Sequence, residues 1–434
     1  MENGNVAKFE SVEEDHGSPQ TRGHLSENPA TQEDSRRPPP LPAPQTKVPR
    51  NLRQALSLDD FEKMAFRYLP SMINGYIAGN VETGAAHLSS VNAYRNYSFI
   101  PRLLLDVSQC DQSINLFGRR YEVPFGIAPI GGAAIAAYKG DVVLAMGAAR
   151  TGQPMIMSAS SLIPLEEVRR AYPEAWFQAY LAGDLARISA MIERVATAGF
   201  ETLVITVDTP VPGNRENNVR SGYSMPVRVT PRVALDSLFH PRWLLQTLVR
   251  TFLSRGMLHF ENMEAERGPP MFSRTPGRNF DARDRLSWEH IVFIRNIWPG
   301  NLVIKGLLAI NDVQRARDAG ADGVILSNHG GRQLDHAVSP LRMLPLIRDA
   351  VPGFPLMIDG GIRRGTDVLK AIALGAAAVF VGRPYIFAAS VAGTAGVQHA
   401  SSLLRDEIRR DMALLGVCNL QELSLNHIIA NNRG

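Results

Sequence analysis

The feature that most constrains the fold of this chain is a series of eight short apolar runs, each followed by a polar or glycine-rich turn and a helix-like segment. Such runs indicate buried parallel strands joined by helices, and eight is the number of strands that closes a barrel. We therefore predict an α/β fold, a (β/α)8 barrel, with a doubly wound open sheet as the alternative. The predicted strands are Phe125–Pro129, Pro154–Ser158, Trp176–Tyr180, Leu203–Val207, Leu302–Lys305, Gly323–Ser327, Pro355–Asp359 and Ala378–Gly382.

Several segments between and before these runs carry helix signals. Upstream of the first run, Ser57 offers an N-cap before Asp59 and Asp60, and an apolar helical period continues through Met72. Most of the later segments end in Ala-Gly or Leu-Gly, as a helix C-terminus requires. The helices predicted between strands are Leu165–Ala171, Ala186–Ala198, Asn311–Ala319 and Gly365–Leu374.

The chain divides into a tail and one barrel domain. Residues 1–52 are polar and proline-rich, and we predict that they are disordered. Arg36, Pro39 and Pro42 have the spacing of a polyproline ligand, although a stiff spacer is the simpler interpretation. Residues 53–434 form the barrel, with an insertion at 209–301 after the fourth strand. A structureless loop of that length is improbable, so we predict that the insertion contains helices and covers or flanks the site.

Composition excludes several classes of function. A formal net charge of +4, without a basic run interleaved with aromatic residues, argues against nucleic-acid binding. The two cysteines, Cys110 and Cys418, lie far apart in the sequence and form no metal-ligand pattern, so no metal site is expected. Their low number, and the absence of a secretory or membrane-spanning segment, favour a cytoplasmic protein.

Polar side chains gather at the carboxyl ends of the predicted strands, where a barrel brings them to one rim. The last two strands end in Asp359-Gly360-Gly361-Ile362-Arg363 and Gly382-Arg383, and glycine amides with arginines are suited to bind a phosphate. The other residues at or near strand ends are Ser158, Gln178, Tyr180, Thr206, Asp208, Lys305, Ser327 and His329.

Two strand ends carry candidate catalytic groups. Lys305 could form a Schiff base or place a fixed positive charge beside an electron-rich ring. His329 stands three residues before Arg332, and Arg215 follows the fourth strand. An imidazole with two guanidinium groups suits the removal of hydrogen next to a carboxylate.

These residues carry a family resemblance that runs from about residue 69 to the C-terminus. The chain resembles the FMN-dependent 2-hydroxy-acid oxidases and dehydrogenases, which include glycolate oxidase, lactate oxidase, lactate 2-monooxygenase and mandelate dehydrogenase. The motifs that carry the resemblance are Pro101–Ser108, Ile205–Pro210, Val303–Gly306, Ser327–Asp335 and Asp359–Gly365.

The resemblance implies a role for each catalytic and substrate-binding residue. His329 would take the substrate proton, with Asp208 stabilising the imidazolium. Lys305 would lie by the N1/O2 edge of the flavin and stabilise the reduced ring. The residues implied to bind the substrate are Tyr76, Tyr180, Arg215 and Arg332.

The resemblance also implies how FMN is held. The ring would be bound by side chains of the early strands and by the backbone that follows the first strand, the ribityl chain by Asp359, and the phosphate by residues after the last two strands. The cofactor-binding residues expected in this way are Pro129, Ile130, Gly131, Ser158, Gln178, Thr206, Lys305, Ser327, Asp359, Gly361, Arg363, Gly382 and Arg383.

Departures from the family pattern bear on the substrate and the oxidant. Gly131 stands where many oxidases have alanine, which favours a dehydrogenase or a monooxygenase over a fast oxidase. Ser160 replaces a bulky tryptophan of some members, which indicates room for a larger substrate. Within the insertion, Asp236–Trp243 resembles mandelate dehydrogenase, and Leu244–Met257 reads either as a membrane-surface amphipathic helix or as a lid helix packed on the barrel.

We therefore expect FMN-dependent oxidation of an (S)-2-hydroxy acid, lactate- or mandelate-like, to the 2-oxo acid. The electrons would pass to a quinone-type acceptor or O2. The family resemblance implies a homo-oligomer, a tetramer, and peripheral contact with a membrane is expected. A decarboxylating lactate 2-monooxygenase activity, a Lys305 Schiff-base lyase and a non-catalytic flavin-binding scaffold remain as alternatives.

Overall fold

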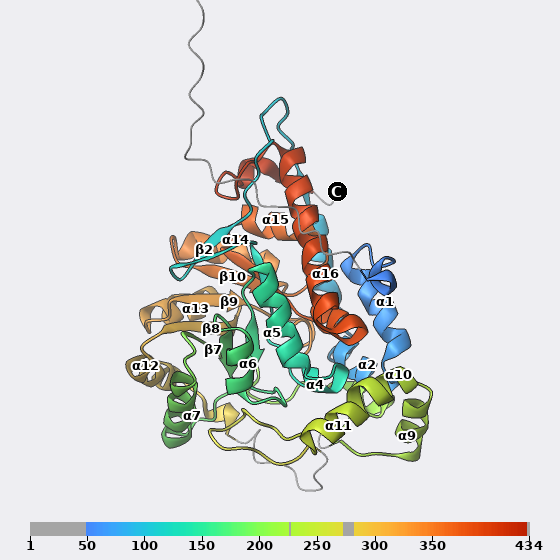
Figure 1. Ribbon diagram of the computed structural model, residues 1–434. Coiled ribbons are helices and arrows are strands. Elements are labelled where there is room, and N and C mark those ends of the chain that lie inside the picture. Colours follow the sequence, from blue (N-terminus) through green and yellow to red (C-terminus); the bar gives the residue numbers. More distant parts are fainter. Residues whose placement is uncertain (1–48, 225–226, 272–281, 432–434) are drawn as a thin grey trace, which may run out of the picture. The chain divides into compact units, whose positions relative to one another are not determined.

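The centre of the molecule is a closed ring of eight parallel strands surrounded by helices (Figure 1). This computed structural model describes residues 49–224, 227–271 and 282–431, so the predictions for residues 1–48 lie outside the described residues. The strands are β4 (Phe125–Ile127), β5 (Ile156–Ser158), β6 (Trp176–Ala179), β7 (Thr202–Thr206), β8 (Asn301–Leu307), β9 (Gly323–Leu326), β10 (Leu356–Asp359) and β11 (Ala378–Val381).

The sheet topology confirms the predicted (β/α)8 barrel. The strands follow one another in the order β4-β11-β10-β9-β8-β7-β6-β5, and every pair is parallel. A further parallel bridge, Ile127 to Met155, joins the two ends of this order and closes the ring. The closure excludes an open doubly wound sheet, whose two edge strands would remain unpaired.

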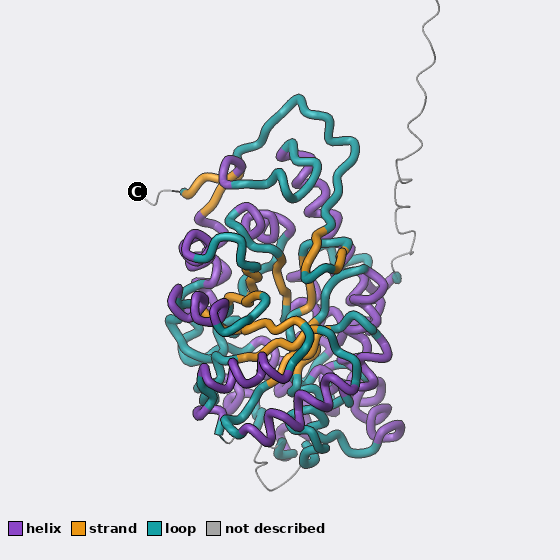
Figure 2. The backbone as a smooth tube through the Cα atoms, turned by 90° about the vertical axis from the view of Figure 1, so that its left-hand side faces the viewer, coloured by secondary structure: helices purple, strands orange, loops and turns teal. Residues whose placement is uncertain are grey.

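Helices form an outer layer because each strand is buried on both faces and each helix offers one apolar side. Figure 2 shows the strands at the centre and the helices around them. The helices of the layer are α4 (Ala133–Ala136), α5 (Gly140–Thr151), α6 (Leu165–Ala171), α7 (Leu185–Thr197), α12 (Trp288–Ile297), α13 (Ile310–Asp318), α14 (Pro340–Ala350), α15 (Gly365–Ala373) and α16 (Arg383–Leu415).

The amino-terminal end of the barrel is closed by a hairpin. Strands β2 (Ile114–Leu116) and β3 (Arg119–Tyr121) pair antiparallel and place Leu116 and Tyr121 in the apolar cluster inside the ring. Trp176 lies beneath them and donates its indole N–H to the Tyr121 hydroxyl at 3.1 Å. This end of the barrel is therefore a packed core.

The segment before the barrel forms more helices than the sequence indicated. Helix α1 (Leu58–Tyr68) follows Ser57, which is the N-cap as predicted and also forms a capping box with Asp60. The apolar period through Met72 does not continue one helix, because Pro70 separates α1 from α2 (Ser71–Ala78), and α3 (Ala85–Ala93) follows. Leu52, predicted to belong to the tail, is fully buried, so the folded chain begins a few residues before position 53.

A two-stranded sheet lies outside the ring of the barrel. Strand β1 (Tyr97–Phe99) pairs antiparallel with β12 (Ile428–Ala430), so the segments before and after the barrel meet. The chain between β1 and β2 extends from the end of the molecule opposite α9 and α11 (Figure 1).

The insertion between β7 and β8 contains helices, as predicted, and lies below the barrel in Figure 1. Trp243 of the insertion anchors it to the barrel, because its indole N–H donates to the Ile135 carbonyl at 2.8 Å. The elements before α12 are α8 (Glu216–Ser221), α9 (Pro231–Leu238), α10 (Pro241–Trp243), a π-helix (Leu244–Val249), α11 (Arg250–Arg255) and a 3-10 turn (Arg283–Arg285).

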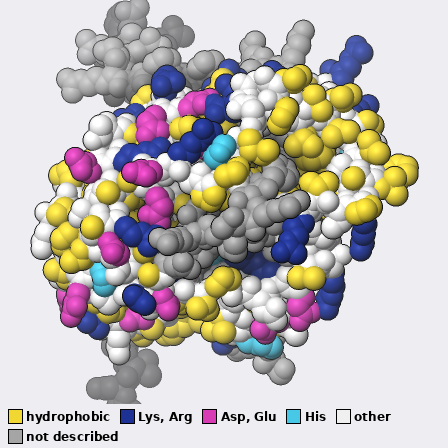
Figure 3. All heavy atoms as spheres, turned by 90° about the horizontal axis from the view of Figure 1, so that it is seen from below, with side chains coloured by type: hydrophobic (Ala, Val, Ile, Leu, Met, Phe, Trp, Pro, Cys, Tyr) yellow, Lys and Arg dark blue, Asp and Glu magenta, His cyan; other side chains and the backbone are white. Residues whose placement is uncertain are grey.

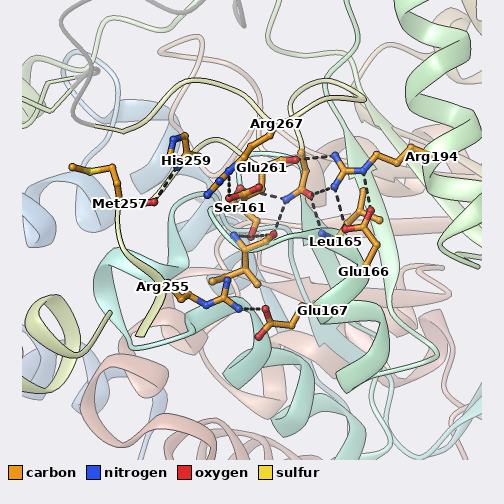
Figure 4. Close-up of polar contacts among 12 residues, drawn as sticks. Ser161, Leu165, Glu166, Glu167, Arg194, Arg255, Met257, His259, Glu261 and Arg267 are labelled. Carbon is orange, nitrogen blue, oxygen red and sulfur yellow. Dashed lines mark hydrogen bonds and ion pairs between the residues drawn. The ribbon is translucent and has the colours of Figure 1, made fainter. Parts of the chain in front are cut away.

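Ion pairs and amide hydrogen bonds tie the insertion to the outer helices (Figure 4). Arg194 of α7 pairs with Glu166 of α6 at 2.9 Å and also donates to the Glu261 carbonyl at 2.8 Å. Arg255, at the end of α11, pairs with Glu167. The insertion is thereby held over the carboxyl ends of the strands.

Candidate active site

A cavity of about 610 Å³ lies at the carboxyl-terminal mouth of the barrel. Its wall combines residues from strand ends, from α2 and from the insertion. The structure brings most of the predicted site residues to this wall, namely Tyr76, Pro129, Ile130, Gly131, Tyr180, Thr206, Arg215, Lys305, His329, Arg332, Asp359, Gly361, Arg363, Gly382 and Arg383.

Four predicted residues support the wall from behind. Asp208 lies behind His329. The Ser327 hydroxyl oxygen accepts a hydrogen bond from the Lys305 ammonium and another from the His329 backbone N–H, both at 2.9 Å. Ser158 and Gln178 are fully buried and hydrogen-bond to each other at 3.0 Å. These groups orient the residues that face the cavity.

His329 is held in a fixed orientation by its backbone and by a carboxylate. Its φ of +57° lies in the left-handed region, which turns the ring toward β7, and Nδ1 lies 2.9 Å from Asp208 Oδ1. Burial lowers the pKa of His329, and the charges of Lys305 and Arg215 lower it further against the opposing effect of Asp208. The imidazole is therefore neutral near pH 7, with Nδ1–H on the carboxylate and Nε2 able to accept a proton.

Asp208 stays ionised in spite of its burial. Burial alone would raise the pKa of Asp208, but the adjacent His329 and Lys305 lower it below its ordinary value. Gly306 permits this arrangement, because a Cβ at its φ of +108° would lie 2.7 Å from the Asp208 Cβ. The carboxylate can thus stabilise a positive charge that develops on the imidazole.

Lys305 provides a fixed positive charge at the floor of the cavity. Its Nζ lies 2.9 Å from Asp359 Oδ2 and 2.9 Å from Ser327 Oγ. Burial would lower the pKa of Lys305, but the Asp359 and Asp208 carboxylates raise it above the ordinary value. The amine is therefore protonated, which disfavours its use as a Schiff-base nucleophile.

Two arginines and two tyrosines surround the space above His329. Arg332 donates from Nη1 to the Ile77 and Gly79 carbonyls and from Nη2 to the Tyr76 carbonyl. These bonds use three of its five N–H groups, so the guanidinium is oriented and still has hydrogens for a ligand. The other groups here are Arg215, which donates to the Arg332 carbonyl at 2.9 Å, Tyr76, whose hydroxyl donates to the Gly131 carbonyl at 3.2 Å, and the partly buried Tyr180.

The far end of the cavity holds a cluster of positive charge. Burial lowers the pKa of Arg383 to about 9, and the neighbouring Arg332 and Arg363 contribute to the shift. Arg383 donates to the Gly330 carbonyl and to Asn80 Oδ1, both at 2.8 Å, so the acceptors in these bonds are neutral. Arg363 is paired with Asp59 and Glu62, both at 3.6 Å. A dianionic phosphate would neutralise the charge of Arg383, whose hydrogen-bond acceptors carry none.

Buried polar atoms without a hydrogen-bond partner also fit a flavin. Among the described residues these atoms include Gln178 Nε2, Thr206 Oγ1 and Asp359 Oδ1, of which the last two belong to residues of the cavity wall. Buried polar groups are normally paired, so a set of them at one cavity points to a polar ligand. The donors and acceptors at the ring end and the arginines at the phosphate end together fit FMN.

The wall includes residues that sequence reasoning did not single out. His87 of α3 lines the cavity, and its Nδ1 accepts a hydrogen bond from Arg383 Nη1 at 3.0 Å. Tyr223 stacks on Tyr76 with ring centroids 4.4 Å apart, and Arg283 lies over the Tyr180 ring at 4.4 Å. These residues come from α3 and from the insertion, outside the repeating strand-turn-helix pattern, so no strand-end signal marked them.

Comparisons with known proteins agree with this geometry. The family described as FMN-dependent dehydrogenase matches residues 65–430. The chain is 36% identical over 382 residues to a putative L-lactate dehydrogenase of Mycobacterium tuberculosis, covering 87% of this chain and 90% of the relative. It is 34% identical over 376 residues to (S)-mandelate dehydrogenase of Pseudomonas putida, covering 86% and 93%.

Solved structures show the same similarity. A crystal structure of the monotopic membrane protein (S)-mandelate dehydrogenase matches with a TM-score of 0.79 and 32% identity, covering 86% of this chain and 99% of that one. A mandelate oxidase structure with benzoyl-formic acid matches with a TM-score of 0.71 and 33% identity, covering 86% and 98%.

The chain belongs to the FMN-dependent dehydrogenase family, which confirms the resemblance found in the sequence. It is an FMN-dependent oxidoreductase of the class that oxidises 2-hydroxy acids.

Proposed function

We propose that this enzyme oxidises an (S)-2-hydroxy acid, lactate- or mandelate-like, to the corresponding 2-oxo acid. The observation that carries the proposal is the neutral His329, held on Asp208 at 2.9 Å in a cavity that also presents Arg215 and Arg332. This set combines a base with two cationic groups for a carboxylate, as the removal of hydrogen next to a carboxylate requires.

His329 acts as the base. Nδ1–H stays on Asp208, and Nε2 accepts the proton that leaves the substrate. The positive charge that forms on the ring lies beside the ionised Asp208, which lowers the free energy of the protonated state. The low pKa of His329 keeps the ring unprotonated before substrate binds.

Arg215 and Arg332 bind the substrate carboxylate, and Tyr76 and Tyr180 direct their hydroxyls toward the carboxylate and the 2-hydroxyl group. The hydrogen bonds of both arginines to carbonyl groups support these roles, because they fix each guanidinium before the substrate arrives. Closure of the mouth by the insertion would exclude water and strengthen these charge-assisted bonds.

The same wall holds FMN, which when bound supplies the acceptor for two electrons. Lys305 would place its charge near the ring, and Asp359 would hold the ribityl chain. Arg363 and Arg383 would hold the phosphate with the amides of Gly361 and Gly382. The residues that would bind the ring are Pro129, Ile130, Gly131 and Thr206 of the wall, with Ser158, Gln178 and Ser327 behind it.

Replacement of His329 by alanine tests the proposed base. We expect the variant to remain yellow and to retain FMN, while its rate of anaerobic flavin bleaching by lactate or mandelate falls by about 10²- to 10⁴-fold. His336→Ala, at an exposed histidine outside the cavity wall, serves as the matched control. Unchanged bleaching in His329→Ala would remove the proposed base.

A graded series of acids extends the same bleaching assay to the substrate. Ser160 and Met263 line the cavity near Gly131, where a Cβ would lie 2.8 Å from the Ser160 Cβ. The support for a substrate side chain larger than a methyl group is the short side chain of Ser160 in the cavity wall. Faster bleaching by mandelate than by lactate is the expected result. Decarboxylated product would instead favour the lactate 2-monooxygenase activity.

We further propose that the electron acceptor of the enzyme is a quinone-type compound or O2, and that a membrane surface lies beside the mouth. An apolar ridge supports the membrane contact; it consists of Leu235, Leu238, Phe239, Leu245, Val249, Phe252, Leu253 and Met257, all exposed. Figure 3 shows hydrophobic side chains gathered over this side of the face that carries the insertion. None of the helices in the described ranges is long and apolar enough to cross a bilayer.

The two sides of the insertion helices support both interpretations made from the sequence. Thr247 and Thr251 are buried against the protein, and Tyr68 hydrogen-bonds to Thr247 at 3.3 Å, so one side packs on the barrel. The opposite side exposes Phe252 (60%) and Leu253 (80%) beside Arg250. Mixing the reduced enzyme with O2 and with a soluble quinone identifies the acceptor, and light scattering tests the predicted tetramer.

A further inference from the structure

The two cysteines of the chain, far apart in the sequence, lie on neighbouring segments of the fold. Cys110 belongs to the connection between β1 and β2, and Cys418 follows the C-terminus of α16. Cys110 Sγ lies 3.7 Å from the carbonyl oxygen of Val417, the residue before Cys418. Cys418 Sγ lies 3.0 Å from the carbonyl oxygen of Asp106. Each thiol therefore contacts the segment that carries the other.

The backbone pairing places the two residues opposite each other. Asp111 and Asn419 form a parallel bridge, and the Asp111 N–H donates to the Cys418 carbonyl at 2.8 Å. Cys110 and Cys418 each precede one member of this bridge by one residue. Paired strands lie about 4.7–4.9 Å apart, which falls within the Cα separation of about 4.4–6.8 Å that a disulfide requires.

Burial raises the pKa of Cys110, and the neighbouring Cys418 raises it further. The reactive thiolate of Cys110 therefore forms more readily as the pH rises. Both thiols are free and only partly buried, so a small oxidant can reach them.

We propose that Cys110 and Cys418 form a redox-modification site that closes into one intramolecular disulfide. The oxidant is a low-molecular-weight disulfide. One cysteine thiolate attacks it and forms a mixed disulfide, releasing one thiol of the oxidant. The second cysteine thiolate then attacks the mixed disulfide, the S–S bond of the protein forms, and the second thiol leaves. The protein loses two electrons and two protons, and the oxidant is reduced to two thiols.

The bond would fasten an exposed segment to the end of α16. Residues 101–109 extend away from the barrel and expose Leu103 and Leu104. They are held near their start by the Arg102 N–H, which donates to the Leu415 carbonyl at 3.1 Å. A covalent link at Cys110 would fix the other end of the segment. Neither cysteine lines the cavity, so the link restrains this segment without changing the site.

The test uses the holoenzyme, first reduced with dithiothreitol and then incubated with glutathione disulfide. We expect alkylation to label two thiols before oxidation and none afterwards, with a loss of two hydrogen atoms in the intact mass. Trypsin digestion of the denatured, oxidised protein should yield peptides 103–119 and 411–433 joined by a disulfide, which dithiothreitol separates. Native cleavage after Arg102 should slow at least severalfold in the oxidised form.

The variants Cys110→Ser and Cys418→Ser are the matched controls. Each should stop at a single glutathione adduct and show native cleavage after Arg102 at the rate of the reduced protein. Two glutathione adducts on the wild type, a covalent dimer, or two thiols that remain open to alkylation would overturn the proposal. A linked peptide pair with unchanged cleavage after Arg102 would overturn the proposed restraint. Flavin bleaching should be equal in both redox forms, so failure here is separable from failure of the proposed function.

Discussion

At its amino-terminal end the barrel is filled by apolar side chains, whereas at its carboxyl-terminal end the same strands surround a cavity of about 610 Å³. Trp176 near the start of β6 packs against Phe117 and Phe380, both with ring centroids at 5.5 Å. Tyr180, just beyond the end of that strand, faces the cavity instead. One strand thus contributes to the core at one end and to the site at the other.

The difference shows how the fold tolerates an active site. The mouth collects buried charges and buried polar atoms without partners, and both arrangements disfavour folding until a ligand binds. The closed end buries aromatic side chains, which favour folding. Substitutions at the two ends should therefore affect different measurements.

The largest expected effect on stability is at the closed end. Trp176→Ala should lower the free energy of unfolding by about 3–5 kcal/mol, because it leaves a cavity and an unpaired Tyr121 hydroxyl. Denaturant unfolding of the holoenzyme measures this loss, with His329→Ala at the mouth as the comparison. Equal losses in the two variants would contradict the division between the ends.

The next effect is on cofactor affinity at the mouth. Arg363→Gln removes the charge proposed to contact the phosphate and should weaken FMN binding by about 10- to 150-fold, or about 1.5–3 kcal/mol. His87→Leu should weaken FMN binding by about fivefold. Arg383 donates to Nδ1 of His87, so the imidazole carries its hydrogen on Nε2, and the variant loses this N–H as a donor to the phosphate. Riboflavin lacks the phosphate, so its affinity should not change in either variant. Fluorescence titration of the apoenzyme measures both ligands.

The apolar ridge distinguishes the mouth from the closed end in a further way. Phe252→Ser and Leu253→Ser should each lower binding to lipid vesicles by about tenfold or more, because each side chain loses about 1.5–3 kcal/mol of apolar burial. Leu414→Ser, at an exposed leucine near the end of α16, is the matched control and should leave vesicle binding unchanged. Flotation with vesicles gives the measurement, and equal losses in all three variants would count against the ridge.

The pH dependence gives the smallest expected effect. Because the pKa of His329 lies below its ordinary value, the base stays unprotonated and active at neutral pH. As the pH falls through that lowered pKa, the imidazole becomes protonated and the rate of flavin bleaching should drop about tenfold per pH unit. Asp208→Asn should lower the pH at which the drop occurs, because Asp208 opposes the lowering of the His329 pKa. A rate that falls already above pH 7 would show a raised pKa instead.

Much of the barrel was predictable from local patterns. The predicted runs overlap all eight strands, and the predicted helix 165–171 has the observed bounds. These predictions hold because a buried strand and an amphipathic helix each leave a short-range pattern in the sequence. The end of α1 was not predicted, because the apolar period crosses Pro70 and hides the break.

The candidate site was predictable where it follows from strand ends. His329, Lys305 and Asp359 were expected at the rim because parallel strands in a barrel place their carboxyl ends together. His87 and Tyr223 were not expected, because they reach the cavity from α3 and from the region after α8. Such contacts join segments that share no repeating pattern.

The sequence by itself determined the eightfold alternation of strand and helix, the rim residues and the family to which they belong. These properties depend on short-range periodicity and on motifs of a few residues. Only the tertiary structure decided that the Arg383 guanidinium contacts His87 and that Cys110 contacts the segment that carries Cys418. Both pairs depend on how distant segments pack, and packing is set by the whole core.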